Sequence, residues 1–266
     1  MKNIIVIKIG GSCIQHQEQL ESLIKAVAKL VSKKIKFVIV HGGGVQADLL
    51  NQKLGIPIKK VNGRRITDSQ TLSTVKMVYK GLLNTDLVSL CQKFKIPAVG
   101  FSGVDGKIAE VIKRPLVGNI DFGFVGDIKK INIDLICILL VKKYVPVITC
   151  LGINNDGQVF NINADTLATQ IALKLKANKL IFITDVEGIT ENKNSKYAKY
   201  LSVNKAKELI NKGIITKGMI PKIENIEDAI SDGIKKVLVV GGLQSQSQWI
   251  NAFQKNKHGT LIVPHY

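Results

Sequence analysis

Lysine and glycine residues at the end of an apolar run are the first candidates for chemistry in this chain. The run Ile4–Ile9 is apolar except for Lys8, and Gly10 and Gly11 follow it at once. A run of this kind indicates a strand that is buried on both faces of a parallel sheet. Glycines let backbone N–H groups approach phosphate oxygens closely, and a lysine adds a compact positive charge. The stretch therefore indicates an anion-binding turn, although a plain strand-ending turn beside a solvated lysine has the same pattern.

A second run repeats the pattern and strengthens this interpretation. Residues 37–40 are apolar and lead into His41-Gly42-Gly43-Gly44. Ligands of open α/β sheets bind outside the carboxyl ends of the strands, so two such ends predict a shared anion cradle. A third run, 237–240, also ends in two glycines, so part of the pattern is structural. Neither glycine stretch fits the dinucleotide fingerprint or the P-loop.

Arginine is rare in this sequence and is confined to its middle. Only three of the 38 basic residues are arginine, namely Arg64, Arg65 and Arg114. A planar guanidinium can hold a carboxylate through two parallel hydrogen bonds, which an ammonium cannot do. Arg65, beside the expected Asn62-Gly63 turn, is the candidate for that role, whereas chance is a reasonable explanation for the other two.

Length and composition restrict the class of protein. With 266 residues and 45% hydrophobic content, the chain can form one large α/β domain or two lobes. No apolar run reaches membrane-spanning length and the first strand begins almost at once, so we expect a cytoplasmic protein without a membrane partner. The four cysteines are scattered, without a C-x-x-C pair, and we expect buried free thiols.

The formal net charge of +18 has several explanations. The lysines are spread along the chain without arginine-rich clusters or a nucleic-acid-binding motif, so we expect no nucleic-acid partner. A general excess also helps acidic small molecules to reach a cleft. A compositional bias toward Lys and Asn explains most of the excess.

Hydrophobic periodicity predicts alternating strands and helices, which is the pattern of an α/β fold. A hairpin is expected over 58–68, and short strands within 107–131, with turns at Gly118-Asn119 and Gly123. The expected strands are Ile4–Ile9, 37–40, 98–101, Val145–Thr149, Lys179–Thr184, 237–240 and Thr260–Val263, and the expected helices are 17–33, one from Val45, 69–83, 85–94, 134–143, one ending near 176, and 218–231.

Six ordered motifs resemble those of the amino acid kinase family and, more narrowly, of its acetylglutamate kinases. The likeness extends over nearly all 266 residues. The motifs are Lys8-x-Gly10-Gly11, His41-Gly42-Gly43-Gly44, Asn62-Gly63-x-Arg65-x-Thr67-Asp68, Asn161-x-Asn163-Ala164-Asp165, Thr184-Asp185-Val186-x-Gly188 and Gly218-Met219-x-x-Lys222.

The resemblance implies an open three-layer α/β/α sandwich with a mainly parallel central sheet. Residues 1–175 would form an N-terminal lobe for acyl-amino-acid binding and dimerisation, and residues 176–266 a C-terminal lobe for nucleotide binding. The implied reaction transfers the ATP γ-phosphoryl group to the side-chain carboxylate of N-acetyl-L-glutamate, an early step of arginine biosynthesis.

The resemblance also implies roles for individual residues. Lys8 and Lys222 would stabilise the transferring phosphoryl group, and Asp165 would hold both lysines in place. The acyl-amino acid would contact Gly43, Gly44, Arg65, Asn161 and Asn163. The nucleotide would contact Gly10, Gly11, Asp185, Lys217, Gly218 and Met219.

The implied reaction needs neither a general base nor a metal site formed by the protein alone. A glutamate-type carboxylate has a pKa of about 4.3, so it is ionised at neutral pH and needs no general base. The reaction needs neutralised phosphoryl oxygens and in-line positioning, which two lysines and a Mg²⁺ ion carried by ATP would supply. No dedicated protein metal motif is visible, so we expect no metal site formed by the protein alone.

Two departures from the family leave alternatives open. Arg64 stands where the family usually has an apolar residue, so N-succinylglutamate or another acidic amino-acid derivative is an alternative acceptor. Lys8 lies seven residues from the start, and the extra N-terminal helix of the arginine-inhibited members is absent. We therefore expect a homodimer, joined through helix 69–83 and insensitive to L-arginine. A non-catalytic regulatory protein on the same fold is the last alternative, and the intact Lys8, Asp165 and Lys222 argue against it.

Overall fold

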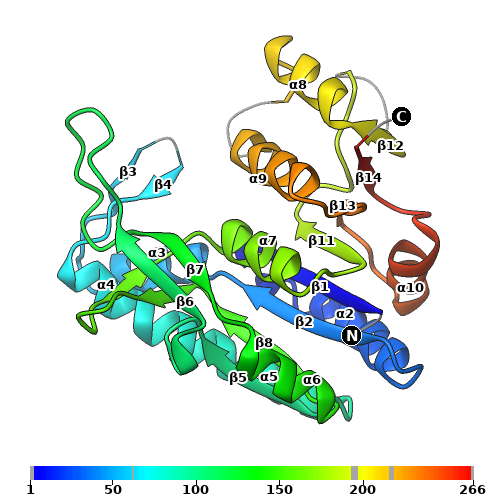
Figure 1. The fold of residues 1–266 in the computed structure, drawn as a ribbon, viewed down its shortest axis with the longest axis horizontal. Coiled ribbons are helices and arrows are strands. Elements are labelled where there is room, and N and C mark those ends of the chain that lie inside the picture. Colours follow the sequence, from blue (N-terminus) through cyan, green and yellow to red (C-terminus); the bar gives the residue numbers. More distant parts are fainter. Residues whose placement is uncertain (1–2, 62, 193–196, 216–218, 265–266) are drawn as a thin grey trace.

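An eight-stranded sheet organises the fold of this computed structural model, which describes residues 3–61, 63–192, 197–215 and 219–264 (Figure 1). Neighbouring strands are parallel except where β13 meets β14. Across the sheet the order is β12 (Tyr200–Ser202), β14 (Thr260–Val263), β13 (Val237–Gly241), β11 (Lys179–Thr184), β1 (Ile4–Ile9), β2 (Lys36–His41), β8 (Val145–Thr149) and β5 (Ala98–Ser102).

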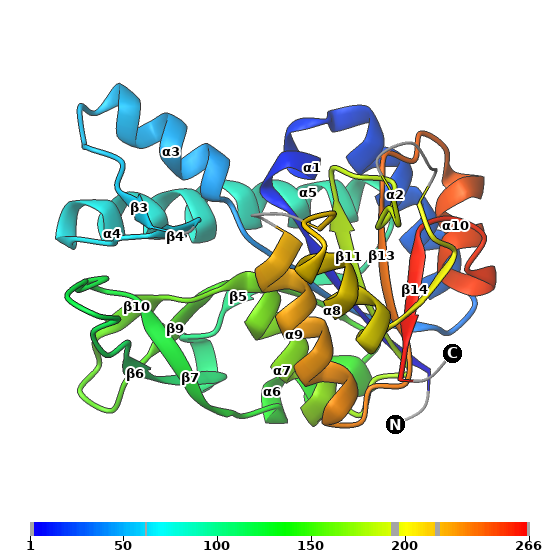
Figure 2. The ribbon, with the colours of Figure 1, turned by 90° about the horizontal axis from the view of Figure 1, so that it is seen from above.

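Helices cover both faces of this sheet, as Figure 2 shows. The central strands are apolar on both faces, and each face needs a layer that removes it from water. One layer contains α1 (Gly11–Gln15), α2 (Gln17–Val31), α5 (Asn84–Lys93) and α10 (Gln246–Lys255), and the other contains α6 (Asp134–Val141), α7 (Ala164–Lys174), α8 (Val203–Asn211) and α9 (Ile220–Ser231). The predicted α/β/α sandwich is confirmed.

The packing of α2 illustrates how the layers are formed. Its leucines and other apolar residues recur at helical spacing, and the stripe is buried against the sheet and α10. Trp249 of α10 is fully buried and donates its indole N–H to Ser22 Oγ at 2.9 Å. A buried indole needs such an acceptor, so this bond joins helices from opposite ends of the chain.

A smaller region projects beyond the carboxyl ends of the sheet strands. It contains α3 (Gly44–Lys53), α4 (Ser69–Lys76) and a 3-10 turn at Asp105–Lys107. The predicted hairpin is present as β3 (Lys60–Val61) and β4 (Arg64–Arg65), and Asn62 of its turn lies outside the described residues. A second sheet has the strand order β10 (Val159–Asn161), β9 (Leu151–Ile153), β6 (Ala109–Lys113) and β7 (Gly126–Ile131).

The two helices predicted over 69–83 and 85–94 are wrong as separate helices. The chain is helical without a break from α4 through a π-helical segment, Met77–Leu83, into α5. Asn84, a residue that often ends helices, is buried and donates to His41 Nε2 and to the Val147 carbonyl, both at 3.0 Å. These tertiary bonds satisfy the amide, so the helix continues.

Several elements were not predicted: α8, α10, β9, β10 and β12. The three strands have only three residues each, which is too short for a periodic pattern. The helices did carry a signal, because Ser202 and Ser245 accept backbone N–H groups as N-caps and Ser245 forms a capping box with Gln248.

Two expectations from composition agree with the structure. The cysteines are free thiols, and Cys13, Cys91 and Cys150 are buried whereas Cys137 is partly exposed. Within the described ranges, each helix is too short or too polar to cross a bilayer.

His41, at the end of β2, makes a pH-dependent contribution to the fold. Its Nε2 faces the donating Asn84 amide and its Nδ1 lies 2.9 Å from the Gly42 carbonyl, so the neutral ring with a proton on Nδ1 fits both partners. Burial lowers the pKa of His41 to about 4, the Gly42 carbonyl opposes this shift, and the charge of Lys80 adds to it. Protonation would also replace the acceptor at Nε2 with a donor.

We predict that the free energy of unfolding falls as the pH is lowered from 6.5 to 4. In that pH window the histidine is protonated in the unfolded chain but not in the folded protein. The resulting loss in the free energy of unfolding is about 3 kcal/mol. Urea denaturation across this window measures it. His41→Gln should flatten the pH slope, whereas His16→Gln at an exposed histidine should leave it unchanged; equal slopes in both variants would contradict the prediction.

Candidate active site

The carboxyl ends of the central strands open into a cleft of about 340 Å³. This volume is at the lower end of the range for small-molecule sites. Glycine turns, cationic side chains and amides form its walls, which suits an anionic ligand. The lining residues are Lys8, Gly11, Gly42, Gly43, Gly44, Lys60, Gly63, Arg64, Arg65, Tyr79, Arg114, Val125, Cys150, Asn161, Ile162, Asn163, Ala164, Thr166 and Asn225.

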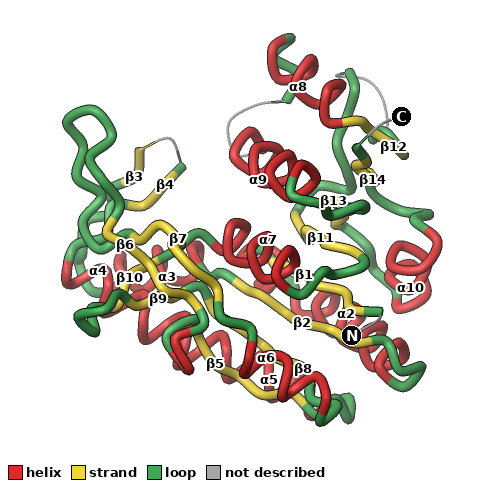
Figure 3. Tube along the Cα trace, in the orientation of Figure 1, coloured by secondary structure: helices red, strands yellow, loops and turns green. Residues whose placement is uncertain are grey.

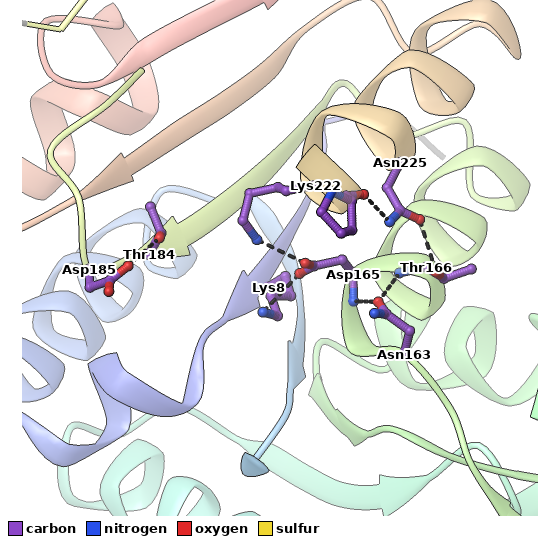
Figure 4. Close-up of polar contacts among 9 residues, drawn as sticks. Lys8, Asn163, Asp165, Thr166, Thr184, Asp185, Lys222 and Asn225 are labelled. Carbon is purple, nitrogen blue, oxygen red and sulfur yellow. Dashed lines mark hydrogen bonds and ion pairs between the residues drawn. The ribbon is translucent and has the colours of Figure 1, made fainter. Parts of the chain in front are cut away.

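Lys8, which lines this cleft, shares one carboxylate with a second lysine, Lys222 (Figure 4). Lys8 Nζ of β1 lies 2.8 Å from Asp165 Oδ1, and Lys222 Nζ of α9 donates to Asp165 Oδ2, also at 2.8 Å. The three side chains are 13%, 9% and 15% exposed for Lys8, Lys222 and Asp165 respectively. The predicted catalytic residues therefore form one contiguous group, hereafter the Lys-Asp-Lys group.

The Lys-Asp-Lys group carries more positive than negative charge. Burial by itself raises the pKa of Asp165, but the charges of Lys8 and Lys222 outweigh it and hold that pKa well below its usual range. Burial and the charge of Lys8 lower the pKa of Lys222, while Asp165 and Asp185 oppose the shift. The fixed carboxylate thus keeps two ammonium groups together, and the group retains a net positive charge for an anion.

The start of α7 sets the direction of Asp165. Asn163 is the N-cap: its Oδ1 accepts the backbone N–H groups of Asp165 at 2.8 Å and Thr166 at 3.0 Å. The Thr166 hydroxyl donates to Asn225 Oδ1 at 2.9 Å, and the Asn225 amide donates to the Pro221 carbonyl at 2.7 Å. These hydrogen bonds join the N-terminal parts of α7 and α9, from which Asp165 and Lys222 project (Figure 4).

The glycine turns are required by close backbone approaches. The Gly10 N–H donates to the Ile183 carbonyl at 3.1 Å, and a Cβ on Gly10 would lie 3.2 Å from that oxygen. A Cβ on Gly43 would lie 2.8 Å from the Tyr79 ring. A side chain at either position would displace a neighbouring group. Both positions therefore favour glycine, and the backbone of the turns remains close to the cleft.

Arg65 lies in the predicted hairpin and is buried, so it is not a solvated surface arginine. Its side chain is 7% exposed. Nη1 pairs with Asp48 and Nη2 donates to the Gly44 carbonyl at 2.8 Å. Asp48 also pairs with Lys60 at 2.6 Å. The hairpin is thus anchored to the glycine turn after β2.

Asp48 and Tyr79 are site residues that sequence reasoning missed. Asp48 carried a signal, as the only carboxylate between Glu21 and Asp68. Tyr79 carried none, because a π-helical segment brings it into the cleft wall, and such segments often lie at functional sites. Burial raises the pKa of the Tyr79 phenol, and the charge of Arg65 opposes this shift.

Asn161 joins three segments at the outer wall. Its amide donates to Thr67 Oγ1 at 3.2 Å, and its backbone N–H donates to the Phe124 carbonyl at 2.9 Å. Thr67 in turn donates its N–H to the Phe122 carbonyl at 2.9 Å and accepts the Phe124 N–H at 2.7 Å. The hairpin, the β6–β7 loop and β10 therefore meet beside the predicted substrate-binding residues.

Three of the predicted nucleotide-binding residues follow the carboxyl ends of β1 and β11. Gly10 and Gly11 come directly after β1, and Asp185 follows β11 and accepts a hydrogen bond from the Thr184 hydroxyl at 2.8 Å (Figure 4). Met219 precedes α9. Lys217 and Gly218 lie outside the described residues. Within the ranges that the structure describes, no three His, Cys, Asp or Glu side chains gather in a way that could hold a metal ion.

The chain is similar to known proteins in both sequence and structure. The model of the amino acid kinase family matches residues 3–241. Acetylglutamate kinase of Aquifex aeolicus is 40% identical over 273 residues, which cover 98% of this chain and 91% of that protein.

Two solved structures are also similar. One, smu.665 of Streptococcus mutans UA159, has a TM-score of 0.82, 30% identity and full coverage of both chains. The other, N-acetylglutamate synthase of Neisseria gonorrhoeae in complex with coenzyme A and N-acetyl-glutamate, has a TM-score of 0.88 at 22% identity. The alignment covers 99% of this chain and 60% of that synthase, and we take from it the fold alone.

We predict that Asp165→Ala lowers the free energy of unfolding by about 3 kcal/mol, because two buried ammonium groups lose their shared counter-charge. Urea denaturation at neutral pH measures this loss. Glu227→Ala is the matched control, since it breaks a pair with half-exposed Lys207 and should cost less than about 1 kcal/mol. Similar small losses in both variants would show that the Lys-Asp-Lys group does not stabilise the fold.

Proposed function

The chain belongs to the amino acid kinase family, and from that premise we propose that it phosphorylates the side-chain carboxylate of N-acetyl-L-glutamate with ATP. The product would be N-acetyl-L-glutamyl 5-phosphate, in arginine biosynthesis. Acetylglutamate kinases at 37–41% identity over nearly the whole chain support this assignment. The observation that carries it is the Lys-Asp-Lys group at the end of a glycine-lined cleft.

The proposed reaction needs charge neutralisation and positioning. A γ-carboxylate oxygen attacks the γ-phosphorus of ATP, the bond to the β-phosphate oxygen breaks, and ADP leaves. The attacking carboxylate is already ionised, so no base takes part. Lys8 and Lys222 would neutralise the transferring oxygens. Asp165 would be the positioning residue, because it contacts both ammonium groups and its charge opposes the lowering of the Lys222 pKa by burial and by Lys8.

The acyl-amino acid is proposed to bind between the glycine turn after β2 and the hairpin. Gly43 and Gly44 would present backbone N–H groups, and Asn161 and Asn163 would present amides. Arg65 would hold the α-carboxylate, because Asp48 and the Gly44 carbonyl occupy only part of its fork of donors. The ion pair with Asp48 fixes the guanidinium before the substrate arrives.

The nucleotide is proposed to bind between the turn after β1 and the region preceding α9. Gly10 and Gly11 would approach the phosphates, and Asp185, Lys217, Gly218 and Met219 would line the site. Residues 1–175 and 176–266 are then the acyl-amino-acid and nucleotide lobes. When ATP is bound, its Mg²⁺ would add charge neutralisation; the nucleotide would supply its ligands, because both Asp165 oxygens already contact lysines. We place the reaction in the cytoplasm, where ATP is available.

We predict that Lys8→Ala and Lys222→Ala each lower kcat by about 10²–10³, as expected for one lost preorganised donor. Coupled ADP release with N-acetyl-L-glutamate as acceptor measures kcat. Lys129→Ala, at an exposed position of β7, is the control and should keep wild-type turnover. Near-normal turnover of the Lys222 variant would remove that lysine from the mechanism, and a wild-type chain that turns over no acidic amino-acid derivative would favour a regulatory protein on this fold.

Arg65→Lys tests the α-carboxylate role. The change keeps one positive charge but loses the planar fork, so kcat/KM for the amino acid should fall about 10- to 150-fold. The KM for ATP should hardly change, because the nucleotide is assigned to the other lobe. Thermal unfolding of the variant provides the folding control, since Arg65 also anchors the hairpin. Unchanged kcat/KM in a folded variant would rule the role out.

We also propose a homodimer joined through the helical segment 69–83. Met77 and Leu82 of this segment are 53% and 54% exposed, and dimerisation would remove them from water. Light scattering should give twice the monomer mass of 29.1 kDa. The double variant Met77→Glu/Leu82→Glu should be monomeric, while Ile138→Glu on α6, equally exposed, should stay dimeric. A monomeric or hexameric wild type would refute the proposal.

A further inference from the structure

Lys222 projects from the first turn of a helix whose start has no side-chain cap. The N-cap position of α9 is Met219, and its side chain accepts no backbone N–H. Pro221 stands within the same turn and has no backbone N–H of its own. The first turn of a helix is held in place mainly by its cap, because its N–H groups have no partner within the helix. A cap therefore does not fix the turn that carries Lys222.

The ammonium group of Lys222 nevertheless occupies a defined place. It donates to Asp165 Oδ2 at 2.8 Å, and it lies 5.0 Å from the centroid of the buried Phe182 ring of β11. The carboxylate and the face of the aromatic ring both attract a cation. The two contacts come from different elements, so they are kept together only if the first turn of α9 stays at a fixed distance from α7 and β11.

Asn225 supplies an anchor for this turn. Helices α7 and α9 pack side by side (Figure 3). The Asn225 amide donates to the Pro221 carbonyl at 2.7 Å, and its Oδ1 accepts the Thr166 hydroxyl at 2.9 Å. Thr166 lies in the first turn of α7, which Asn163 caps. The Asn225 side chain thus ties the uncapped start of α9 to the capped start of α7.

Resting on the proposed function, we propose that Asn225 is a positioning residue for Lys222 and that it acts through Thr166. The contact of Lys222 with Asp165 is one link between α9 and α7, and the bond of Asn225 to Thr166 is a second. One link alone would let α9 pivot about it, whereas two links fix its orientation. Phosphoryl transfer depends on in-line geometry, in which a displacement of about 1 Å can lower the rate about 100-fold. Asn225 therefore contributes to kcat without contacting the reacting atoms.

Two nearly isosteric variants test this role. Asn225→Leu removes both bonds of the amide, and Thr166→Val removes the hydroxyl. With ATP and N-acetyl-L-glutamate, each should lower kcat about 10- to 100-fold and change either KM little. The double variant should be no slower than the slower single variant, because both changes break the same link. Thr166→Ser restores the hydroxyl and should restore kcat.

Thr169→Val is the matched control on the same helix. Thr169 is 1% exposed, and within the described ranges its hydroxyl has no hydrogen-bond partner, so this variant should keep the wild-type kcat. A purely structural role of Asn225 predicts a lower free energy of unfolding at unchanged kcat. A direct contact of Asn225 with a substrate predicts a higher KM at unchanged kcat. Either of these results would overturn the positioning role.

A measurement without turnover separates this inference from the proposed function. Acetic anhydride acetylates accessible, unprotonated lysines, and peptide mass spectrometry reports the rate at each site. Loss of the Asp165 contact would expose the Lys222 amine and remove a charge that favours its protonated form. Lys222 should therefore react faster in Asn225→Leu than in the wild type, whereas exposed Lys142 should react equally in both. If the wild type phosphorylates no acylglutamate, the kinase proposal fails and this labelling decides the inference, which equal rates at Lys222 would overturn.

Discussion

The pairing of Lys8 and Lys222 with one buried carboxylate is the interaction on which the rest of the site depends. Two ammonium groups that are withdrawn from water repel each other, and a shared counter-charge at 2.8 Å from each offsets that repulsion. The fold meets this demand with three separate elements. Strand β1 brings one lysine, the first turn of α9 brings the other, and Asn163 caps α7 so that Asp165 faces both. Because the lysines lie 57 and 157 residues from Asp165, the group also joins the two ends of the chain across the sheet.

The walls of the cleft follow a second constraint, which is close packing of the glycine backbone against neighbouring protein groups. A Cβ on Gly10 would lie 3.2 Å from the Ile183 carbonyl oxygen, and a Cβ on Gly43 would lie 2.8 Å from the Tyr79 ring. The third glycine pair is packed in the same way: a Cβ on Gly241 would collide with the Thr184 carbonyl oxygen of the neighbouring strand, and Gly242 has a φ of +68°. Close packing therefore accounts for glycine at all three strand ends.

Charge in this protein acts at two scales. Most of the net +18 comes from lysines on the surface, which attract acidic molecules without selecting among them. The arginines act locally. Arg65 and Arg114 are buried and paired with Asp48 and Asp127, whereas Arg64 is exposed at the cleft opening. A fixed guanidinium beside a neutralising carboxylate can discriminate between ligands, because it gains from a planar anion without adjusting its own position.

The sequence alone determined the apolar strands of the large sheet, most of the helices and the glycine turns. Local patterns record these features as continuous apolar runs, helical stripes and glycines at strand ends. The members of the Lys-Asp-Lys group were predicted from the resemblance to the amino acid kinase family. Only the tertiary structure decided that Arg65 is buried against Asp48, that helix 69–93 continues through Asn84, and that Tyr79 reaches the cleft. It also decided that Asn163 caps α7 while still lining the cleft. The first three of these depend on a partner outside the local segment: Asp48 for Arg65, His41 and Val147 for Asn84, and Gly43 for Tyr79. A local pattern describes how one segment meets water, and it contains no information on which distant group will satisfy a buried donor.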